Sequence, residues 1–140
     1  MSLRYLVGVA LVIAWSGRVA AADVILDVLE IADHSPEEVA AQIGEPTRCD
    51  ETYQGLSCQY GDEVEIIYID GKADWIQVTP MAEIPFEPTA LKHLGLLVTL
   101  PLVRNPFRMH WDGHQGLAVV SLFGSGRYVA LFQVRSVTRQ

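Results

Sequence analysis

The chain has 140 residues, of which 50% are hydrophobic and 19% are charged, so it can bury a core and is neither disordered nor fibrous. Its 10 Lys and Arg residues against 17 Asp and Glu residues give a net charge of -7. This balance argues against general binding to nucleic acid or anionic lipid, because both are polyanions. The length suits one domain and excludes a large multidomain enzyme.

The first 22 residues have the pattern of a secretory leader. Arg4 supplies the positive start, residues 5–15 are apolar, and small residues precede a cleavage point after Ala22. We therefore predict export to the periplasm or the medium and a single domain over residues 23–140. A retained membrane anchor is the alternative, but the apolar run ends at Arg18 and is short for a bilayer that needs roughly 20 apolar residues. No stable membrane insertion is expected after cleavage.

The chain has two cysteines, Cys49 and Cys58. In an exported protein such a pair is usually oxidised, so we predict a disulfide that closes a small loop or the mouth of a hairpin. A metal site or a catalytic thiol is the alternative, but neither Cys has a His at ligand spacing.

The first half of the predicted domain contains one clear helix signal. Residues 24–31 alternate weakly between apolar and acidic side chains and predict an edge strand or an extended lead-in. Ser35 can cap a helix and Pro36 suits its first position, so a short helix is predicted to begin there. Gly44 is placed to end that helix, and Pro46 prevents its continuation.

Three strands are predicted after this helix. Residues 56–60 form the first, residues 64–69 are a β-branched and aromatic run, and residues 73–79 form the third. Asp70-Gly71 lies between the last two and is typical of a tight hairpin turn.

The same order of elements is predicted in the second half. Residues 88–96 form a short helix with Thr89 as its cap, and strands follow at residues 107–111, 116–123 and 127–135. We therefore predict an α+β fold made of two tandem units, each a helix plus a three-stranded meander, over about residues 33–80 and 87–135. Their strands form one antiparallel sheet, and both short helices pack on one face of it.

The two halves differ in charge. Residues 23–90 hold 16 acidic and two basic residues, whereas residues 91–140 hold six basic residues and one acidic residue. One interpretation is that opposite charges attract across a shared core and keep the surface soluble. The other is that the acidic half captures a partner with a basic surface.

Several short motifs resemble a known group of exported domains. The order of four segments is similar to that in domains related to the β-lactamase inhibitor protein and to BamE-like outer-membrane lipoproteins. These segments are residues 35–46, a segment bounded by the two cysteines, Cys58-Gln59-Tyr60 and residues 69–73. The resemblance spans about residues 33–134, and the tandem units are most similar to the inhibitor protein. It implies a domain that binds other proteins and has no active site. The chain departs from the pattern at Gly124-Ser125-Gly126, where a second turn like Asp70-Gly71-Lys72 is expected, and it has no Cys at the cleavage point for a lipid.

Residues 110–114, with the sequence HWDGH, are the strongest candidate metal ligands, because His110, Asp112 and His114 lie within five positions. The Asp-Gly pair at the centre favours a turn, which separates the two imidazoles and makes a solvated loop the better interpretation. Ser57 and Ser121 lack the sequence surroundings of a nucleophile. We therefore expect no catalytic residue, no cofactor and no metal.

Aromatic side chains are the better candidates for function. If the helices cover the sheet face that bears Ile67 and Ile76, then Tyr68 and Trp75 lie on the uncovered side, where large aromatic residues favour protein binding. The alternative is that the aromatic residues close the core between the two units. The protein-binding residues predicted on the first interpretation are Tyr60, Glu65, Tyr68, Asp70, Asp74, Trp75 and Trp111.

From these patterns we expect a non-enzymatic, exported module that binds another protein, for example an inhibitor or immunity protein for an extracytoplasmic enzyme. Two alternatives stay open. One is an accessory factor in envelope assembly, and the other is a small metal-dependent hydrolase that uses His110, Asp112 and His114.

Overall fold

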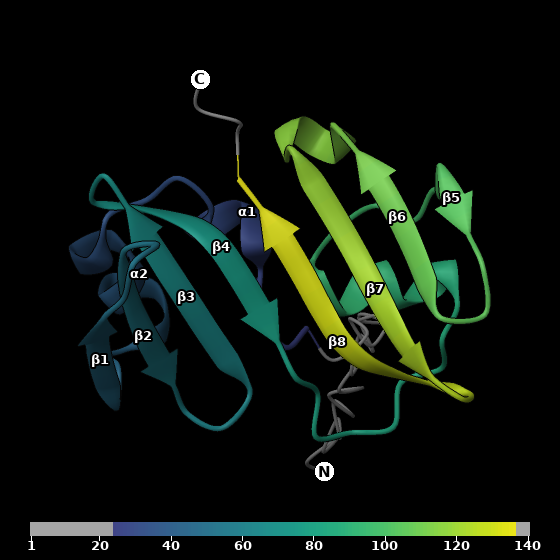
Figure 1. Cartoon of the computed structure of the whole chain (residues 1–140), viewed down its shortest axis with the longest axis horizontal. Helices are drawn as coiled ribbons and strands as arrows, with labels where there is room; N and C mark the ends of the chain where they lie inside the picture. The colour runs from purple at the N-terminus through teal and green to yellow at the C-terminus, as the bar shows by residue number, and fades with distance from the viewer. Residues whose placement is uncertain (1–23, 137–140) are drawn as a thin grey trace, which may run out of the picture.

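The computed structural model describes residues 24–136, and the leader predicted for residues 1–22 lies outside them. Within the described residues, the chain is an α+β protein with one eight-stranded antiparallel sheet and short helices (Figure 1). The helices are α1 (Val28–Ile31), α2 (Pro36–Ile43) and the 3-10 helices η1 (Pro88–Leu94) and η2 (His114–Gly116). The strands are β1 (Arg48–Glu51), β2 (Leu56–Tyr60), β3 (Val64–Ile69), β4 (Lys72–Val78), β5 (Val103–Arg104), β6 (Arg108–Asp112), β7 (Val119–Ser125) and β8 (Tyr128–Arg135).

The sheet has the strand order β1-β2-β3-β4-β8-β7-β6-β5. Each half of the chain therefore forms a meander of consecutive antiparallel strands, and the last strands of the two meanders, β4 and β8, pair antiparallel at the centre. Strands β1 and β5 lie at the two ends of this order and form the edges of the sheet (Figure 1).

The prediction of an antiparallel sheet is confirmed, but the prediction of three strands in each half is wrong. Each half has four, because β1 precedes the first predicted meander and β5 precedes the second. Both additional strands are short and fully exposed, so they carry no alternation of buried and exposed residues by which the sequence could reveal them.

Helix α2 forms as its sequence predicts. The Ser35 side chain accepts a hydrogen bond from the Glu38 amide, and the Glu38 carboxylate accepts one from the Ser35 amide, so the two residues make a capping box. These hydrogen bonds hold the pKa of Glu38 below its usual value. The helix ends at Ile43, and Gly44 follows it with a positive φ of 88°.

The prediction of a strand or extended segment over residues 24–31 is wrong at its end, where α1 forms one helical turn. Val28 and Ile31 are both buried, and a spacing of three places both side chains on the same side of that turn. The second predicted helix forms as the 3-10 helix η1. It begins after Glu87, which makes no side-chain cap, so the cap predicted at Thr89 is also wrong.

Helices α1, α2 and η1 lie behind the sheet in Figure 1, and η2 lies at one end of it. Their buried side chains, among them Val39 and Leu91, join one core cluster with residues from both halves of the sheet. The face of the sheet toward the viewer in Figure 1 is called the open face below. In the described part of the chain, no helix is long and apolar enough to cross a membrane.

Cys49 and Cys58 form a disulfide, as predicted. The two residues lie directly opposite each other on β1 and β2, so the bond ties the edge strand to its neighbour.

Candidate functional site

The open face carries a continuous line of polar side chains across the sheet. Residues that pair across antiparallel strands lie on the same face, so the register identifies each member of the line. We call this line the polar row: Gln59, Glu65, Gln77, Gln133, Ser121 and His110, on β2, β3, β4, β8, β7 and β6 in that order.

Beside the polar row, Trp75 and Arg135 face each other across the central pair of strands. The guanidinium carbon of Arg135 lies 4.3 Å from the centre of the Trp75 ring, a cation–π contact. The Trp75 side chain is half-buried, and Arg135 also approaches the Asp74 carboxylate, with an N–O distance of 3.8 Å.

The prediction that Tyr68 and Trp75 share the open side of the sheet is wrong. A β-bulge lies between Ile67 and Tyr68, so that Ile67 pairs with Trp75 while Tyr68 pairs with Ala73. Asp74 is the extra residue, and it turns Trp75 to the face opposite Tyr68. Tyr68 is only 2% exposed and lies in the core cluster.

Tyr60 and Trp111 are also buried in the core cluster, so the alternative interpretation applies to three of the four aromatic residues. The hydroxyl groups of Tyr60 and Tyr68 hydrogen bond to each other. Burial raises the pKa of both phenols, so both stay protonated in the folded protein at neutral pH.

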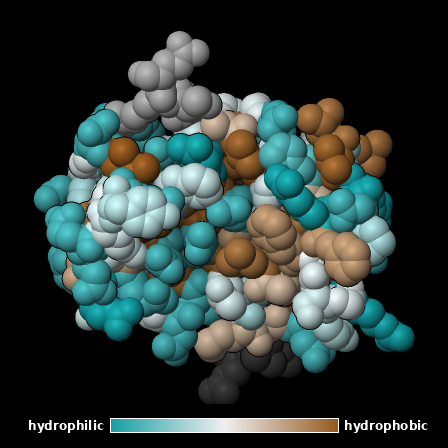
Figure 2. Space-filling model, in the orientation of Figure 1, coloured by the Kyte–Doolittle hydropathy of each residue, from teal (hydrophilic) through white to brown (hydrophobic). Residues whose placement is uncertain are grey.

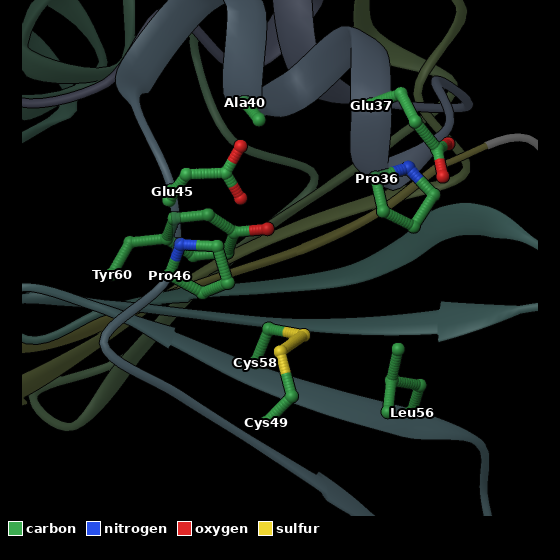
Figure 3. A pocket seen from close by; sticks show the side chains of 9 residues that line it. All are labelled: Pro36, Glu37, Ala40, Glu45, Pro46, Cys49, Leu56, Cys58 and Tyr60. Atoms are coloured by element: carbon green, nitrogen blue, oxygen red, sulfur yellow. A yellow bond between two sulfur atoms is a disulfide. The ribbon is translucent and has the colours of Figure 1, made fainter.

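A shallow pocket lies between α2 and the first two strands, above the disulfide (Figure 3). The Glu37 and Glu45 carboxylates lie at its rim, and Tyr60 lies beside Pro46. Its volume of about 150 Å³ is below the range of about 300 to 1,000 Å³ that is usual for small-molecule sites. The residues that line it are Pro36, Glu37, Ala40, Glu45, Pro46, Cys49, Leu56, Cys58 and Tyr60.

The three acidic residues predicted for binding lie in different surroundings. Asp70 is exposed in the hairpin turn between β3 and β4, where it adopts a positive φ of 52°. Glu65 is half-buried on the open face and accepts a hydrogen bond of 2.9 Å from the Ser57 hydroxyl. Asp74 is buried, accepts a hydrogen bond from Ser136 and pairs with Arg135, so it is not the free surface charge that the sequence suggested.

At one end of the polar row, side chains of β6 and β7 form a cluster that the sequence analysis missed. The Ser121 Oγ lies 3.0 Å from Nδ1 of His110, and Nε2 of His110 lies 2.6 Å from the Asp112 carboxylate. Nη2 of Arg108 lies 2.9 Å from the same Nδ1, and a guanidinium can only donate, so Nδ1 is the acceptor of this contact.

This cluster has the residue types of a hydrolytic triad but the environment of a structural network. The Ser121 side chain lies within β7 between two neighbouring strands, and the residue is 1% exposed. The Arg108 guanidinium also lies 3.5 Å from the Ser121 hydroxyl. The sequence carries one signal for this cluster: His110 and Asp112 are two positions apart on a strand, which places both side chains on the same face. Ser121 could not be predicted as their partner, because its position depends on the register between β6 and β7.

The proposed metal ligands do not converge. His110 and Asp112 bond to each other, but Nε2 of His114 donates to the Leu97 carbonyl, 2.8 Å away. Among residues 24–136, no group of three or more His, Cys, Asp or Glu side chains is placed to hold a metal ion. The three residues therefore do not form the ligand set on which the hydrolase alternative depends.

A second feature missed from the sequence is an exposed apolar segment at the β5 edge of the sheet. We call residues 97–107 the apolar edge. Figure 2 shows brown, hydrophobic surface at the side where Figure 1 draws β5, whereas the side of β1 to β3 is mainly teal. The exposed large hydrophobic residues of this segment are Leu97, Val98, Leu100, Leu102, Val103 and Phe107.

Comparison of the chain with protein-family models, with curated proteins and with solved structures finds no match.

Proposed function

We propose that the protein is an exported, non-enzymatic module that binds another protein through the open face of its sheet. The observation that carries this proposal is the Trp75–Arg135 pair at the centre of that face. Tryptophan and arginine are among the side chains most enriched at the energetic centres of protein interfaces, and here each holds the other in position.

The surroundings of this pair support the same role. The polar row offers amide and carboxylate groups beside it, and Glu65 and Asp70 favour a partner with a basic surface. The Ser121 hydroxyl is buried, which favours a structural role for its cluster, because a nucleophile has to reach its substrate.

We further propose that the chain consists of two diverged copies of one unit. The strand order supports this proposal, because β1 to β4 and β5 to β8 occupy equivalent positions on the two sides of the β4–β8 pair. A duplicated domain is also what the resemblance to the β-lactamase inhibitor protein implies.

The disulfide is consistent with the oxidising compartment to which we assign the protein, the periplasm or the medium.

The test of the proposed function is a pull-down from envelope extract with Trp75→Ala. We expect loss of a partner that the wild-type protein recovers, because the substitution removes the ring on which Arg135 stacks. Tyr53→Ala is the matched control, since this aromatic residue is 97% exposed in the segment between β1 and β2 and should retain the partner. Equal recovery with Trp75→Ala, in a protein that remains folded by circular dichroism, would exclude the open face as the binding surface.

An accessory role in envelope assembly is the second candidate, and the apolar edge favours it, because an envelope component could cover those exposed side chains. A protection assay separates the two functions. An inhibitor or immunity protein protects cells from its target enzyme, whereas an assembly factor does not protect them and is recovered in complex with an envelope component.

A further inference from the structure

The apolar edge exposes hydrophobic side chains to an extent that a soluble monomer rarely does. Leu100 is 85% exposed and Phe107 is 74% exposed, and four other large hydrophobic residues of the segment are exposed with them. Single exposed hydrophobic residues are ordinary, but a cluster of this kind marks a contact surface.

The backbone of this segment is held against the body of the protein by side chains of β6 and η2. Trp111 donates to the Thr99 carbonyl over 3.2 Å, and His114 and Gln115 bond the carbonyl and the amide of Leu97. These bonds satisfy backbone groups from the inner side and leave the apolar side chains outside. The segment is therefore a formed surface whose exposed groups are mainly apolar.

The turn between β5 and β6 is satisfied in the same way. The Asn105 side chain accepts hydrogen bonds of 2.9 Å from the amides of both Phe107 and Arg108, and the Asn105 amide donates to the Arg108 carbonyl. Phe107 therefore protrudes from a turn whose amides already have partners. Such a turn can enter an apolar environment without leaving these amides unpaired.

The charges around the apolar edge are mainly positive. Residues 88–112 include Lys92, Arg104 and Arg108, and their single acidic residue is Asp112, which lies beside Leu100 and Leu102 and hydrogen bonds to His110. The net charge of -7 arises in the other half of the chain, where residues 23–90 hold 16 acidic residues. An anionic surface would therefore attract this edge, repel the acidic half and orient the whole molecule.

We propose that the apolar edge docks the protein onto the surface of a phospholipid membrane that contains anionic lipid. The side chains of Leu100, Leu102 and Phe107 enter the interfacial region of the bilayer, and Arg104 and Arg108 meet the lipid phosphates. A symmetric pair of copies is the less favoured occupant, because it would bring the arginines of both edges together. The contact is with the membrane surface and needs no membrane-spanning helix.

Sedimentation with lipid vesicles tests this proposal on the secreted form of the protein. We expect binding to vesicles of phosphatidylethanolamine with phosphatidylglycerol, much weaker binding to phosphatidylcholine alone, and a decrease at high salt. The double variant Leu100→Gln with Phe107→Gln should bind about tenfold less to the anionic vesicles, because it removes the two most exposed apolar groups of the edge. Arg104→Gln with Arg108→Gln should reduce binding to the anionic vesicles only.

Tyr53→Gln is the matched control, because its exposed ring lies in the acidic half of the chain and it should bind vesicles as the wild type does. Trp75→Ala should also retain vesicle binding, which separates this inference from the proposed protein-binding face. Absence of binding to both vesicle types would overturn the proposal. So would a dimer in solution that the Leu100 and Phe107 substitutions convert to a monomer, since the edge would then join two copies of the chain.

Discussion

Trp75 and Tyr68 show how one extra residue changes the surface of the sheet. The two-residue turn at Asp70-Gly71, with positive φ at both positions, would by itself place Trp75 opposite Ile66 and on the buried face. The bulge at Asp74 moves Trp75 to the open face, where Arg135 stacks on it. The identity of the exposed aromatic residue therefore depends on an irregularity that binary patterning does not reveal.

The paired hydroxyl groups of Tyr60 and Tyr68 are a polar contact inside the core. Tyr68→Phe should lower the free energy of unfolding by about 1 to 2 kcal/mol, because it leaves the Tyr60 hydroxyl without its partner. Urea unfolding of the two proteins measures this difference. Tyr53→Phe should leave the free energy unchanged, since Tyr53 is exposed.

The same pair gives the protein a dependence on alkaline pH. The pKa of both phenols is raised in the folded state relative to about 10 in the unfolded chain, so their contribution to stability is complete below pH 10 and falls as the pH rises above it. The decrease in unfolding free energy between about pH 9 and 11 should be smaller in Tyr68→Phe than in the wild type. An equal decrease in both proteins would contradict the assignment to this pair.

At the scale of elements, the position of β1 depends on the turn that leads to β2. The Thr52 and Gly55 backbones hydrogen bond to each other, and a Cβ at Gly55 would lie 2.2 Å from the Tyr68 carbonyl oxygen. The turn therefore lies directly against β3, and only glycine allows that approach.

Gly55→Ala should destabilise the protein by about 2 kcal/mol or more, because the carbonyl it meets belongs to the sheet and cannot move freely. Gly61→Ala is the control. Gly61 also has a positive φ, of 59°, but a Cβ there would meet no atom within 4 Å, so only the backbone cost of about 1 kcal/mol applies. Thermal unfolding of both variants checks the difference, and equal losses would show that the contact with Tyr68 does not matter.

At the scale of the whole molecule, the pairing of β4 with β8 joins the two halves into one sheet. Phe132 on β8 is fully buried opposite Val78 of β4 and Leu122 of β7, and the core cluster continues across this junction. The two halves should therefore unfold together rather than as separate units.

Phe132→Ala should cost about 3 to 5 kcal/mol and should destabilise both halves in a single transition. Trp75 and Trp111 report on opposite halves, so tryptophan fluorescence and far-UV circular dichroism should give the same midpoint. Leu131→Ala, at a half-buried neighbouring position, should cost distinctly less. Two separate transitions would show that the junction does not couple the halves.

The local features of the chain can be predicted from short stretches of its sequence. The capped helix after Ser35, the Asp70-Gly71 hairpin, most of the strands and the disulfide all follow from turn chemistry, capping and residues close along the chain. Tertiary structure alone decided the short edge strands, the face on which Trp75 lies, the contact of Ser121 with His110 and the exposure of the segment around Leu100. Each of these depends on register or on what packs over a segment, and residues distant in sequence set both, so the local pattern carries no record of them.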